Sequence, residues 1–555
     1  MSSSFADKIQ MQHKLFAELS AMFGKEVPLY DKALDVNRQC NKTICAFLSI
    51  QHPGFTISDE QLEKTSGERH GAIRIGRKDE YRWIARFFAA FAMEPHNYYD
   101  MSNVGAKSQP IIATAFRSEV NPEHRVFTSL LQTDYFDPDT QARIEALLAK
   151  RTVFSDTAKA LIEKGEKQGG LSWDDATQLI TEATTRIFKW TGKARDHNLY
   201  KHLSEAGFKI AADISCFESH HLNHLTPNTF CIDLYTAAMK FCMGEMTAEQ
   251  FAWRAERALG HMKTIGDKHY MRLSFRHLSA EVIAEYGSVE VSDGQIRDLA
   301  SKLMARLQQP DLVLTGLKHS GFKDFTEGPA AGVPVLLRQD AYKALTEPVV
   351  FTNDDGTVVN TVHTARFGEI EQRFYATTRK GRELYDKCLA LADAAREKDP
   401  SLPKKDFPAY EALYAAPFAP FPTTLPELLE QKLVYARYFA TAKGIAAKGR
   451  IASADVKELL AAGYLGYEGL RYEDFLPVSA AGIFASNLQQ YGTKSSAAVK
   501  PVYTQQMLEE IMGKKIIDTD VAYKAAETES LAKALGELGL GDRVSAASRP
   551  ELAAV

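Results

Sequence analysis

Cysteine is scarce in this sequence, and its spacing excludes two kinds of site. The chain has 555 residues and six cysteines, and no two of the cysteines form a CxxC pair. A thiolate zinc site and a disulfide framework both need cysteines that are more closely or more regularly spaced. We therefore expect a protein of a reducing compartment, the cytoplasm.

Long apolar runs and strong charge are absent as well. No run of about 18 apolar residues occurs, which argues against a membrane-spanning helix. The N-terminal stretch MSSSFADKIQMQHKLF lacks the basic and then apolar pattern of a secretory signal. The formal net charge is −4, with 45% hydrophobic and 25% charged residues, an ordinary globular mix. We expect no nucleic-acid partner and no membrane partner.

Several common catalytic motifs are missing. The sequence has no Walker-type phosphate loop, no GxGxxG that opens a helix after a strand, no HExxH and no GxSxG. None of the 15 histidines is followed two residues later by Asp or Glu, so the HxD pair of jelly-roll iron oxygenases is absent. Any active site must therefore be assembled from less familiar segments.

Helical and strand-like patterns alternate along the chain. Thr247 with Gln250 and Ser292 with Gln295 form capping boxes, which predict the starts of two helices. The stretch from GVPVLLRQ to HTARFGEIEQRFYATT is rich in Val, Thr and Phe, which predicts strands. The fold class that we expect is α+β, with helices around a β-rich centre.

The segment RHGAIR places His70 and Arg74 four residues apart, on one face of either a helix or a strand. A metal-bound histidine beside a fixed guanidinium suits a substrate that chelates the metal and carries a distant carboxylate. For the pair in isolation, a surface histidine and a solvated arginine are the more common interpretation.

The segment SHHLNHLTP contains three histidines within five residues. His220 and His224 could share one metal ion on a helix, but Asn223 and Pro227 disfavour a regular helix here. One ligand with two bystanders fits better than three ligands, and His224, just before the Thr-Pro turn, is the better candidate. A capping or core histidine is the alternative.

The segment HTARFGEIEQR contains two glutamates that would share one face of a strand, Glu369 and Glu371. A carboxylate on an inward face is costly unless it is paired or bound to a metal. An exposed strand edge, with Arg366 and Arg373 as ion-pair partners, is an equal alternative.

Two histidines and one glutamate from these three segments match the 2-His-1-carboxylate site. Such a site leaves positions open for a chelating substrate and dioxygen, and it suits non-haem Fe(II), although Mn(II) accepts the same ligand types. Spacing does not show that the three segments meet.

Six segments, taken in order, resemble the 2-oxoadipate dioxygenase/decarboxylase family, also called hydroxyglutarate synthases. They are ERHGAIRIG, HRVFTSLL, NHLTP, PVLLRQ, HTARFGEIEQR and YEDFLPVSAAGIF. The resemblance covers roughly residues 10–235 and 325–490. It implies a fold related to the vicinal-oxygen-chelate superfamily, a partly open β-barrel around a metal with helices outside it.

The resemblance also implies a reaction and the residues for it. Members of the family convert 2-oxoadipate, an intermediate of lysine breakdown, and O₂ to 2-hydroxyglutarate and CO₂, with Fe(II) as the cofactor. By resemblance, the catalytic and metal-ligating residues are His70, His224 and Glu371. The implied partners are a small 2-oxo dicarboxylic acid and O₂, and the oligomeric state stays open. The implied substrate-binding residues are His70, Arg74, His224, Glu371, Val478 and Ser479.

Three features depart from the family's pattern. Asn228 stands where we expect arginine, Phe374 stands where we expect glycine, and both neighbour predicted ligands. The stretch from 236 to 325 is longer than we expect, and we interpret it as a helical insertion outside the barrel. The predicted parts are a single catalytic domain at 1–490, its helical N-terminal part at about 1–200, its β-rich metal-binding core at 66–76, 211–235 and 325–390, the helical insertion at 236–325 and a C-terminal polar tail at 491–555.

Two other functions fit parts of the pattern. A zinc-dependent hydrolase could use the His220/His224 cluster and a distant carboxylate, but its general base is unassigned because HExxH is absent. A non-catalytic metal-binding scaffold protein is the other alternative. It would need neither Arg74 beside a ligand nor an open coordination position.

Overall fold

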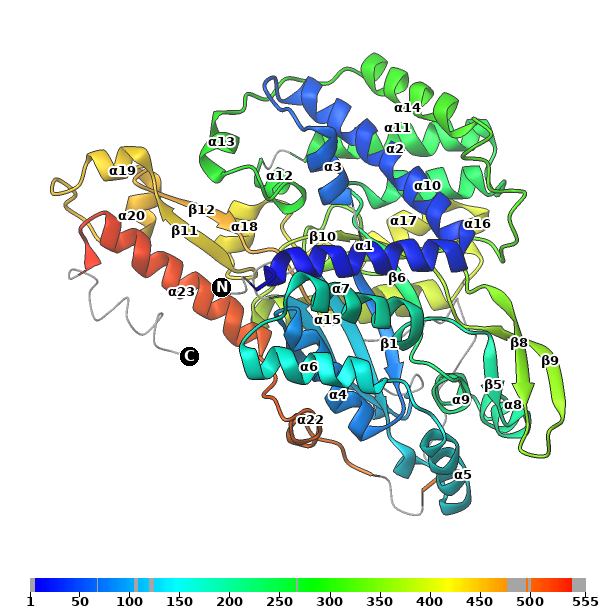
Figure 1. Cartoon of the computed structure of the whole chain (residues 1–555). Coiled ribbons are helices and arrows are strands. Elements are labelled where there is room, and N and C mark those ends of the chain that lie inside the picture. The colour runs from blue at the N-terminus through cyan, green and yellow to red at the C-terminus, as the bar shows by residue number, and fades with distance from the viewer. Residues whose placement is uncertain are drawn as a thin grey trace.

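The computed structural model describes residues 5–66, 68–103, 108–118, 124–265, 268–476, 496–497 and 501–541. Helices surround several small sheets in it (Figure 1), so the predicted α+β class is confirmed. Within the described part of the chain, no helix combines the length and the apolar character needed to cross a membrane.

A five-stranded sheet lies at the centre of the molecule. Its strands in spatial order are β2 (Met93–Asp100), β3 (Ile111–Ser118), β4 (Arg125–Leu131), β1 (Glu68–Ile75) and β6 (His224–Pro227). β1 pairs in parallel with β4 and antiparallel with β6, so the segment ERHGAIRIG forms an interior strand. Every side chain of β3 and β4 is buried, which is expected for a sheet covered on both faces.

An antiparallel ribbon continues this sheet beyond β6. It consists of β7 (Leu337–Ala341) and β10 (Glu369–Arg373). Asn228, directly after β6, forms a β-bridge with Glu371, and the Thr229 N–H donates to the Glu371 carbonyl oxygen at 2.9 Å. The strands therefore follow one another in the order β1, β6, β10, β7, although the described strands do not close into a barrel.

Helices of the N-terminal part cover the central sheet. α4 (Lys78–Ala90) packs on β1 and β2 and buries Phe87 and Phe88 of the stretch WIARFFAAFAM. α6 (Asp156–Gln168) packs on α4, α7 (Trp173–Glu182) packs on α6, and α1 (Lys8–Glu26) packs on α7 (Figure 1). The sheet is thus enclosed by elements that come before it and between its strands in the sequence.

The upper layer in Figure 1 is helical and contains the segment predicted as an insertion. Both predicted capping boxes are present, at the starts of α11 and α14. Apolar side chains of both helices belong to the same buried core as those of the sheet, so this segment packs against the rest of the molecule. The helices here are α2 (Pro28–Gln51), α3 (Asp59–Ser66), α10 (Ile232–Cys242), α11 (Ala248–Thr264), α12 (His269–Ser274), α13 (Ala280–Glu285) and α14 (Asp293–Leu307).

Two smaller sheets lie at the periphery. β5 pairs with β8, which pairs with β9, and this sheet lies beside α8. β11 and β12 form a ribbon against α23. Their bounds are β5 (Lys193–Arg195), β8 (Thr346–Thr352), β9 (Val358–Thr364), α8 (His197–Glu205), β11 (Ala436–Ala440), β12 (Leu465–Gly469) and α23 (Thr519–Glu537).

The C-terminal segment differs from the polar tail that the sequence suggests. Its described part contains α22 (Gln505–Met512) and α23. Leu508 of α22 and Leu535 of α23 are buried, because each helix turns one apolar stripe toward its neighbours. The segment is therefore folded onto the molecule over these residues.

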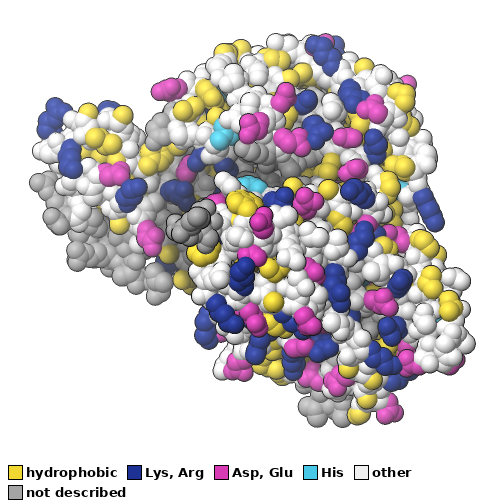
Figure 2. Space-filling view, in the orientation of Figure 1, with side chains coloured by type: hydrophobic (Ala, Val, Ile, Leu, Met, Phe, Trp, Pro, Cys, Tyr) yellow, Lys and Arg dark blue, Asp and Glu magenta, His cyan; other side chains and the backbone are white. Residues whose placement is uncertain are grey.

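On the face in Figure 2, basic and acidic side chains are interspersed, in keeping with the formal net charge of −4.

The remaining helices connect these layers. The connecting helices are α5 (Pro138–Ala149), α9 (Lys209–Cys216), α15 (Arg379–Glu397), α16 (Leu402–Lys405), α17 (Phe407–Ala415), α18 (Leu425–Glu430), α19 (Ala442–Ala446) and α20 (Val456–Ala461).

Candidate metal centre

One face of the central sheet collects the side chains that the sequence singles out. His70 and Arg74 of β1 are an even number of residues apart, so they point to the same face. β6 places His224 opposite Ala72, and directly opposed residues of paired strands share a face. β4 places Arg125 beside His70. Strand pairing thus brings together residues that are far apart in the sequence.

His70, His224 and Glu369 form a compact group of possible metal ligands, here called the candidate cluster. Glu369 Oε2 lies 3.4 Å from His70 Nε2 and 3.3 Å from His224 Nε2. Among the residues that the structure describes, these three are the group whose ligand atoms all lie within 4.8 Å of one another. All three side chains are buried. The cluster has the predicted composition of two imidazoles and one carboxylate.

The polar atoms of the candidate cluster are poorly satisfied by the protein itself. In the described part of the chain, both ring nitrogens of His224, Nε2 of His70 and Oε1 of Glu369 lack a hydrogen-bond partner. Burial, followed by the charge of His70, lowers the pKa of His224, and burial raises the pKa of Glu369. Buried polar atoms without partners are costly. A divalent cation would satisfy them, and Fe(II) and Mn(II) both accept a donor set of this kind.

Glu371 shares a face of β10 with Glu369 but has other partners. Its Oε2 lies 2.9 Å from His70 Nδ1, and its Oε1 accepts from Arg125 Nη2 at 2.8 Å and from Arg373 Nε at 2.6 Å. Burial alone would raise the pKa of Glu371, but the charges of Arg373, His70 and Arg125 hold it well below its usual range. The structure therefore brings Glu369 to both histidines of the cluster, and Glu371 to one.

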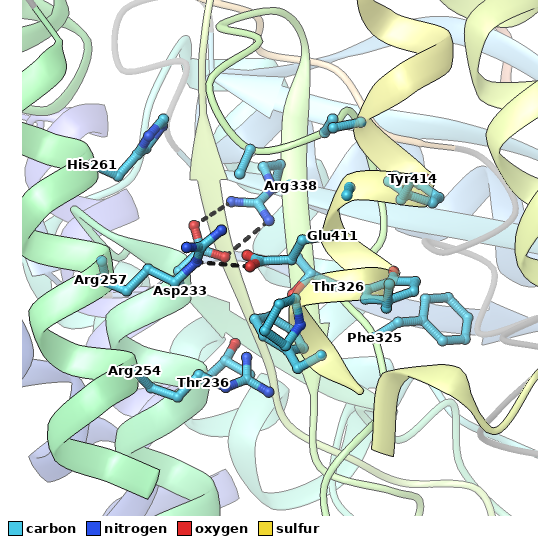
Figure 3. Close-up of a pocket in the computed structure, with 18 of the residues that line it drawn as sticks. Asp233, Thr236, Arg254, Arg257, His261, Phe325, Thr326, Arg338, Glu411 and Tyr414 are labelled. Atoms are coloured by element: carbon cyan, nitrogen blue, oxygen red, sulfur yellow. Dashed lines mark hydrogen bonds and ion pairs between the residues drawn. The ribbon is translucent and has the colours of Figure 1, made fainter. Parts of the chain in front are cut away.

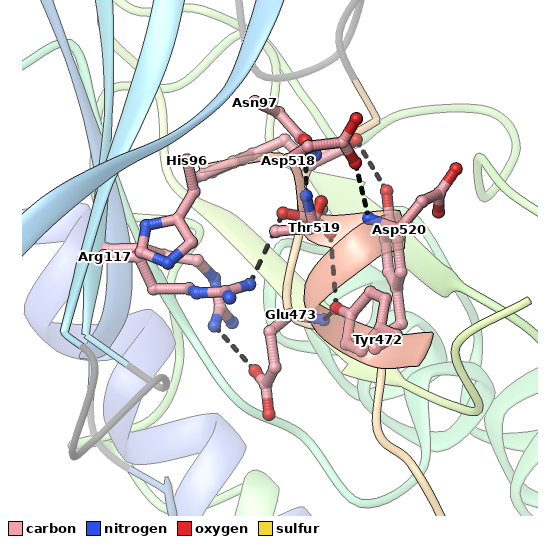
Figure 4. A network of polar contacts seen from close by, with 12 residues as sticks. His96, Asn97, Arg117, Tyr472, Glu473, Asp518, Thr519 and Asp520 are labelled. Atoms are coloured by element: carbon pink, nitrogen blue, oxygen red, sulfur yellow. Dashed lines mark hydrogen bonds and ion pairs between the residues drawn. The ribbon is translucent and has the colours of Figure 1, made fainter. Parts of the chain in front are cut away.

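A buried polar network lies behind Arg125. Its Nη1 donates to Glu473 Oε2 at 2.9 Å, and the Glu473 N–H donates to the hydroxyl of Tyr523 in α23 at 2.7 Å. At the start of the same helix, the Thr519 N–H donates to Asn97 Oδ1 at 3.1 Å (Figure 4). α23 is thus part of the polar network that holds Arg125 behind the candidate cluster.

A second polar group holds Arg74. Arg74 Nη1 donates to Asp213 Oδ2 and to Asn223 Oδ1, both at 2.6 Å. Asp213 Oδ1 lies 3.3 Å from His221 Nε2 and 3.5 Å from His363 Nε2. Both bonds of Arg74 come from one nitrogen, so the guanidinium is fixed while Nε and Nη2 remain for other acceptors.

We expect the stability contributed by Asp213 to depend on pH. Burial alone would raise its pKa, but His221, His363 and Arg74 hold it well below its usual range. A carboxyl with a depressed folded-state pKa stabilises the fold fully above its unfolded pKa of about 3.9, and this stabilisation is lost as the pH falls through the folded-state pKa. Asp213→Asn should cost about 2 kcal/mol at pH 7.

Urea unfolding of wild type and Asp213→Asn at pH 7 and at about pH 3 measures this effect. The difference in unfolding free energy should shrink at the lower pH, because there the Asp213 carboxyl of the unfolded chain binds a proton while that of the folded protein does not. If the difference in unfolding free energy between wild type and variant is the same at both pH values, the negative charge of Asp213 contributes nothing to stability.

Two aromatic rings cover the histidines. The Phe367 ring stacks on His224 with the centroids 4.8 Å apart, and the Phe475 ring meets His70 edge-on at 4.8 Å. Both phenylalanines are buried, so they shield the imidazoles from water and limit their rotation. Val478 and Ser479, which the resemblance places near the substrate, lie outside the described residues.

The other histidines of SHHLNHLTP point to different partners. His220 Nε2 lies 3.1 Å from Glu80 Oε2, and Glu80 also pairs with Arg151 at 2.8 Å. His221 faces Asp213, as described above. Within the described residues, His220 and His224 therefore share no metal site, and a zinc centre built on both lacks one of its ligands.

Several residues around the candidate cluster were not predicted as parts of a site. Arg125 begins the otherwise apolar segment RVFTSLL, and Asp213 interrupts the apolar segment KIAADISC. A charged residue in such a segment is rarely buried without a partner, which is the signal that was available. Arg373 was considered at an exposed edge, but all five residues of β10 are buried.

The two departures from the family's pattern have partners outside the candidate cluster. Asn228 Oδ1 accepts from Arg471 Nη2 at 3.3 Å, and its carbonyl oxygen accepts from Asn37 Nδ2 at 2.9 Å. Phe374 is buried in a core that lies beside the end of β7 and α15. In the structure both side chains therefore serve the packing next to β10.

Comparison with protein families matches one family over two stretches. The sequence model of the 2-oxoadipate dioxygenase/decarboxylase family matches residues 15–250 and 295–487. The two stretches contain every residue of the candidate cluster. The unmatched residues between them hold most of α11 together with α12 and α13.

Individual relatives align with nearly the whole chain. The 2-oxoadipate dioxygenase/decarboxylase of Pseudomonas putida is 33% identical over 554 residues, which is 97% of this chain and 99% of the relative. That of Escherichia coli is 30% identical over 538 residues, covering 95% and 98%. A crystal structure of the hydroxyglutarate synthase of P. putida in complex with 2-oxoadipate matches with a TM-score of 0.67 at 32% identity, covering 97% of this chain and 99% of that one.

Proposed function

Because the chain belongs to the 2-oxoadipate dioxygenase/decarboxylase family, we propose that it converts 2-oxoadipate and O₂ to 2-hydroxyglutarate and CO₂. Both oxygen atoms of O₂ enter the products, so no second substrate is needed. The family's substrate arises in lysine breakdown, and we place the reaction in lysine catabolism. All six cysteines are buried and free, which supports action in the reducing cytoplasm.

The candidate cluster is the observation that carries the proposal. Two imidazoles and one carboxylate lie within reach of a single ion, and a fixed arginine shares their face of the sheet. A metal-binding scaffold would not need the fixed arginine, and a zinc hydrolase would need a general base beside the metal. An Fe(II) oxygenase of 2-oxo acids needs both the cluster and a group that binds the distant carboxylate.

We assign the metal ligands as His70, His224 and Glu369. The resemblance predicts Glu371 as the carboxylate ligand, whereas the distances favour Glu369, whose Oε2 lies within 3.4 Å of both imidazoles. Bound there, Fe(II) supplies the oxidation chemistry with O₂ that no side chain can perform. Glu371 holds the proton of His70 on Nδ1, so that Nε2 presents its lone pair to the cluster.

The other residues bind the substrate and exclude water. Arg74 binds the carboxylate of 2-oxoadipate that is distant from the 2-oxo group, in the fork geometry that its Nε and Nη2 allow. Asp213 and Asn223 keep the guanidinium in place for this contact. Phe367 and Phe475 keep water from the imidazoles, and we place Val478 and Ser479 at the substrate as the resemblance implies.

We further propose that the central sheet and the β10–β7 ribbon form the partly open barrel of the vicinal-oxygen-chelate type. The bridge between Asn228 and Glu371 supports this arrangement, because it joins β6 to β10 around the candidate cluster. A crystal structure with substrate bound would test it by showing whether the substrate lies on the face of these strands that carries the candidate cluster.

Oxygen consumption by the Fe(II)-loaded protein tests the proposed function. The protein is purified without oxygen, given Fe(II) and 2-oxoadipate, and then exposed to O₂ while the products are followed by mass spectrometry. We expect equal amounts of O₂ consumed, CO₂ released and 2-hydroxyglutarate formed. No consumption with 2-oxoadipate or with shorter and longer 2-oxo diacids would overturn the proposal.

Arg74→Met tests the binding role within the same assay. Loss of a charged contact of this kind costs about 2–5 kcal/mol, so KM for 2-oxoadipate should rise about 30-fold or more with a smaller change in kcat. Arg77→Met is the matched control, since Arg77 pairs with the exposed Asp79. Equal KM values for the two variants would contradict the assignment.

A further inference from the structure

A cavity of about 530 Å³ lies on the far side of the β10–β7 ribbon from the candidate cluster. Glu369 and Glu371 face the cluster, so Gln372 faces the other side, and Arg338 of β7, paired with Gln372, shares that side. The Ile232 N–H of α10 donates to Gln372 Oε1 at 3.0 Å, which places α10 on this side as well. The cavity is therefore separate from the candidate metal centre.

The cavity has the size and the walls of a small-molecule site. Its volume falls within the roughly 300–1,000 Å³ that is usual for ligand pockets. Figure 3 shows Phe325 and Tyr414 on one wall, across the cavity from Arg257 and His261 of α11, whereas the Arg254 guanidinium lies over the Phe407 ring, with Cζ 2.9 Å from the ring centroid. Such walls bind a flat apolar group through stacking and burial. The aromatic residues are Phe325, Phe407, Tyr410 and Tyr414.

The carboxylates that line the cavity are already paired with basic residues. Asp233 Oδ2 lies 2.7 Å from Arg338 Nη1, and Glu411 Oε2 lies 2.8 Å from Arg257 Nε (Figure 3). Asp324, the third, contacts lysines at the rim. Each of the three therefore already has a basic partner in contact, and it acts on Lys240 or Arg254 only from beyond ion-pair distance.

Two basic side chains of the lining have no such partner. Lys240 of α10 and Arg254 of α11 form no ion pair with any of the described residues. Burial lowers the pKa of Arg254 to about 10, and burial also lowers the pKa of Lys240. The carboxylates that oppose this lowering, chiefly Asp340 for Lys240 and Glu411 for Arg254, act from beyond ion-pair distance, so an anion in the cavity would gain from both cations.

We propose that this cavity is a second binding site, for a small organic anion that carries one carboxylate or phosphate group on a flat apolar body. Lys240 and Arg254 bind the anionic group, and the aromatic wall binds the apolar body. The site goes beyond the proposed oxygenase function and does not depend on it, because its ligand neither reaches the candidate cluster nor takes part in the reaction.

Calorimetric titration of the full-length protein with benzoate and with phenyl phosphate tests the proposal. Binding of either probe supports the proposal, and the probe that binds more tightly shows whether the site prefers a carboxylate or a phosphate group. Phenol, which lacks the charge, should bind at least about tenfold more weakly, because charged contacts supply the selectivity. Absence of saturable binding by both anions at millimolar concentration would overturn the proposal.

Two variants assign the binding to this cavity. Lys240→Met/Arg254→Met should weaken the better probe about 30-fold or more, and Ala331→Phe should block the cavity from its rim while both cations remain. Arg297→Met/Lys302→Met removes the same charge from the exposed face of α14 and should leave binding unchanged. The thermal unfolding midpoint of each variant shows whether it is folded. If the first two variants are folded and bind the probe as tightly as wild type does, the assignment is contradicted.

Discussion

Glu369→Gln is expected to abolish high-affinity metal binding and, with it, consumption of O₂. The variant keeps the shape of the side chain but removes the negative charge that faces both imidazoles of the candidate cluster at 3.4 and 3.3 Å. Loss of a ligand should exceed the roughly 10–100-fold that loss of an outer partner costs in metal affinity. Fe(II) content after anaerobic loading and gel filtration measures the effect without reference to activity.

Glu371→Gln is the matched variant, two residues away on the same strand face. Because Glu371 contacts His70 Nδ1 and two arginines, we expect its loss to weaken metal binding about 10–100-fold, with binding restored by excess Fe(II). If Glu371→Gln binds no metal at any concentration while Glu369→Gln binds normally, Glu371 is the ligand, as the resemblance predicts. The pair of variants thus decides between the two glutamates.

Arg125→Met is expected to lower the free energy of unfolding by about 3–5 kcal/mol, because it removes a buried cation that bridges two buried carboxylates. Arg125 Nη2 lies 2.8 Å from Glu371 Oε1 and Nη1 lies 2.9 Å from Glu473 Oε2, and all three side chains are buried. Without the guanidinium, both carboxylates lose a partner that water cannot replace. Urea unfolding at pH 7 measures the change.

The control for Arg125→Met is an exposed pair of similar geometry. Arg306 Nη2 lies 2.7 Å from Asp311 Oδ2, and both side chains are more than one-third exposed. Solvent screening limits such pairs to about 1 kcal/mol or less, so Arg306→Met should be nearly neutral. Equal losses in the two variants would show that the buried network contributes no more than a surface pair.

Several elements could be predicted from the sequence because their signals are local. The capping boxes at Thr247 and Ser292 start α11 and α14, since a cap depends only on residues within one turn. The strand containing His70 and Arg74 follows from small and β-branched residues between glycines, and the even spacing places both on one face. The likeness of six segments to one family is local information too, and the family was confirmed.

Other features could not be predicted, because they depend on what packs against a segment. An amphipathic tail sequence does not reveal whether its apolar stripe finds a neighbour, and α23 finds one in β11 and β12. The burial of Arg373 likewise depends on Glu371 and on carbonyl oxygens of the loop at residues 472–474, far away in the chain. Hydrogen-bond partners of this kind lie at no fixed distance along the sequence from the buried residue, so the sequence does not reveal them.

The sequence by itself determined the class of the fold, the family and the chemical types in the site. Composition and motifs specify which donors are available, and strand period specifies which of them share a face. Only the tertiary structure decided that β6 and β10 meet and that Glu369 reaches both imidazoles. The physical reason is that strand period places Glu369 and Glu371 on the same face and does not distinguish them. A metal ligand must lie within a few tenths of an ångström of the right position, and which glutamate does so depends on the side chains that face each of them.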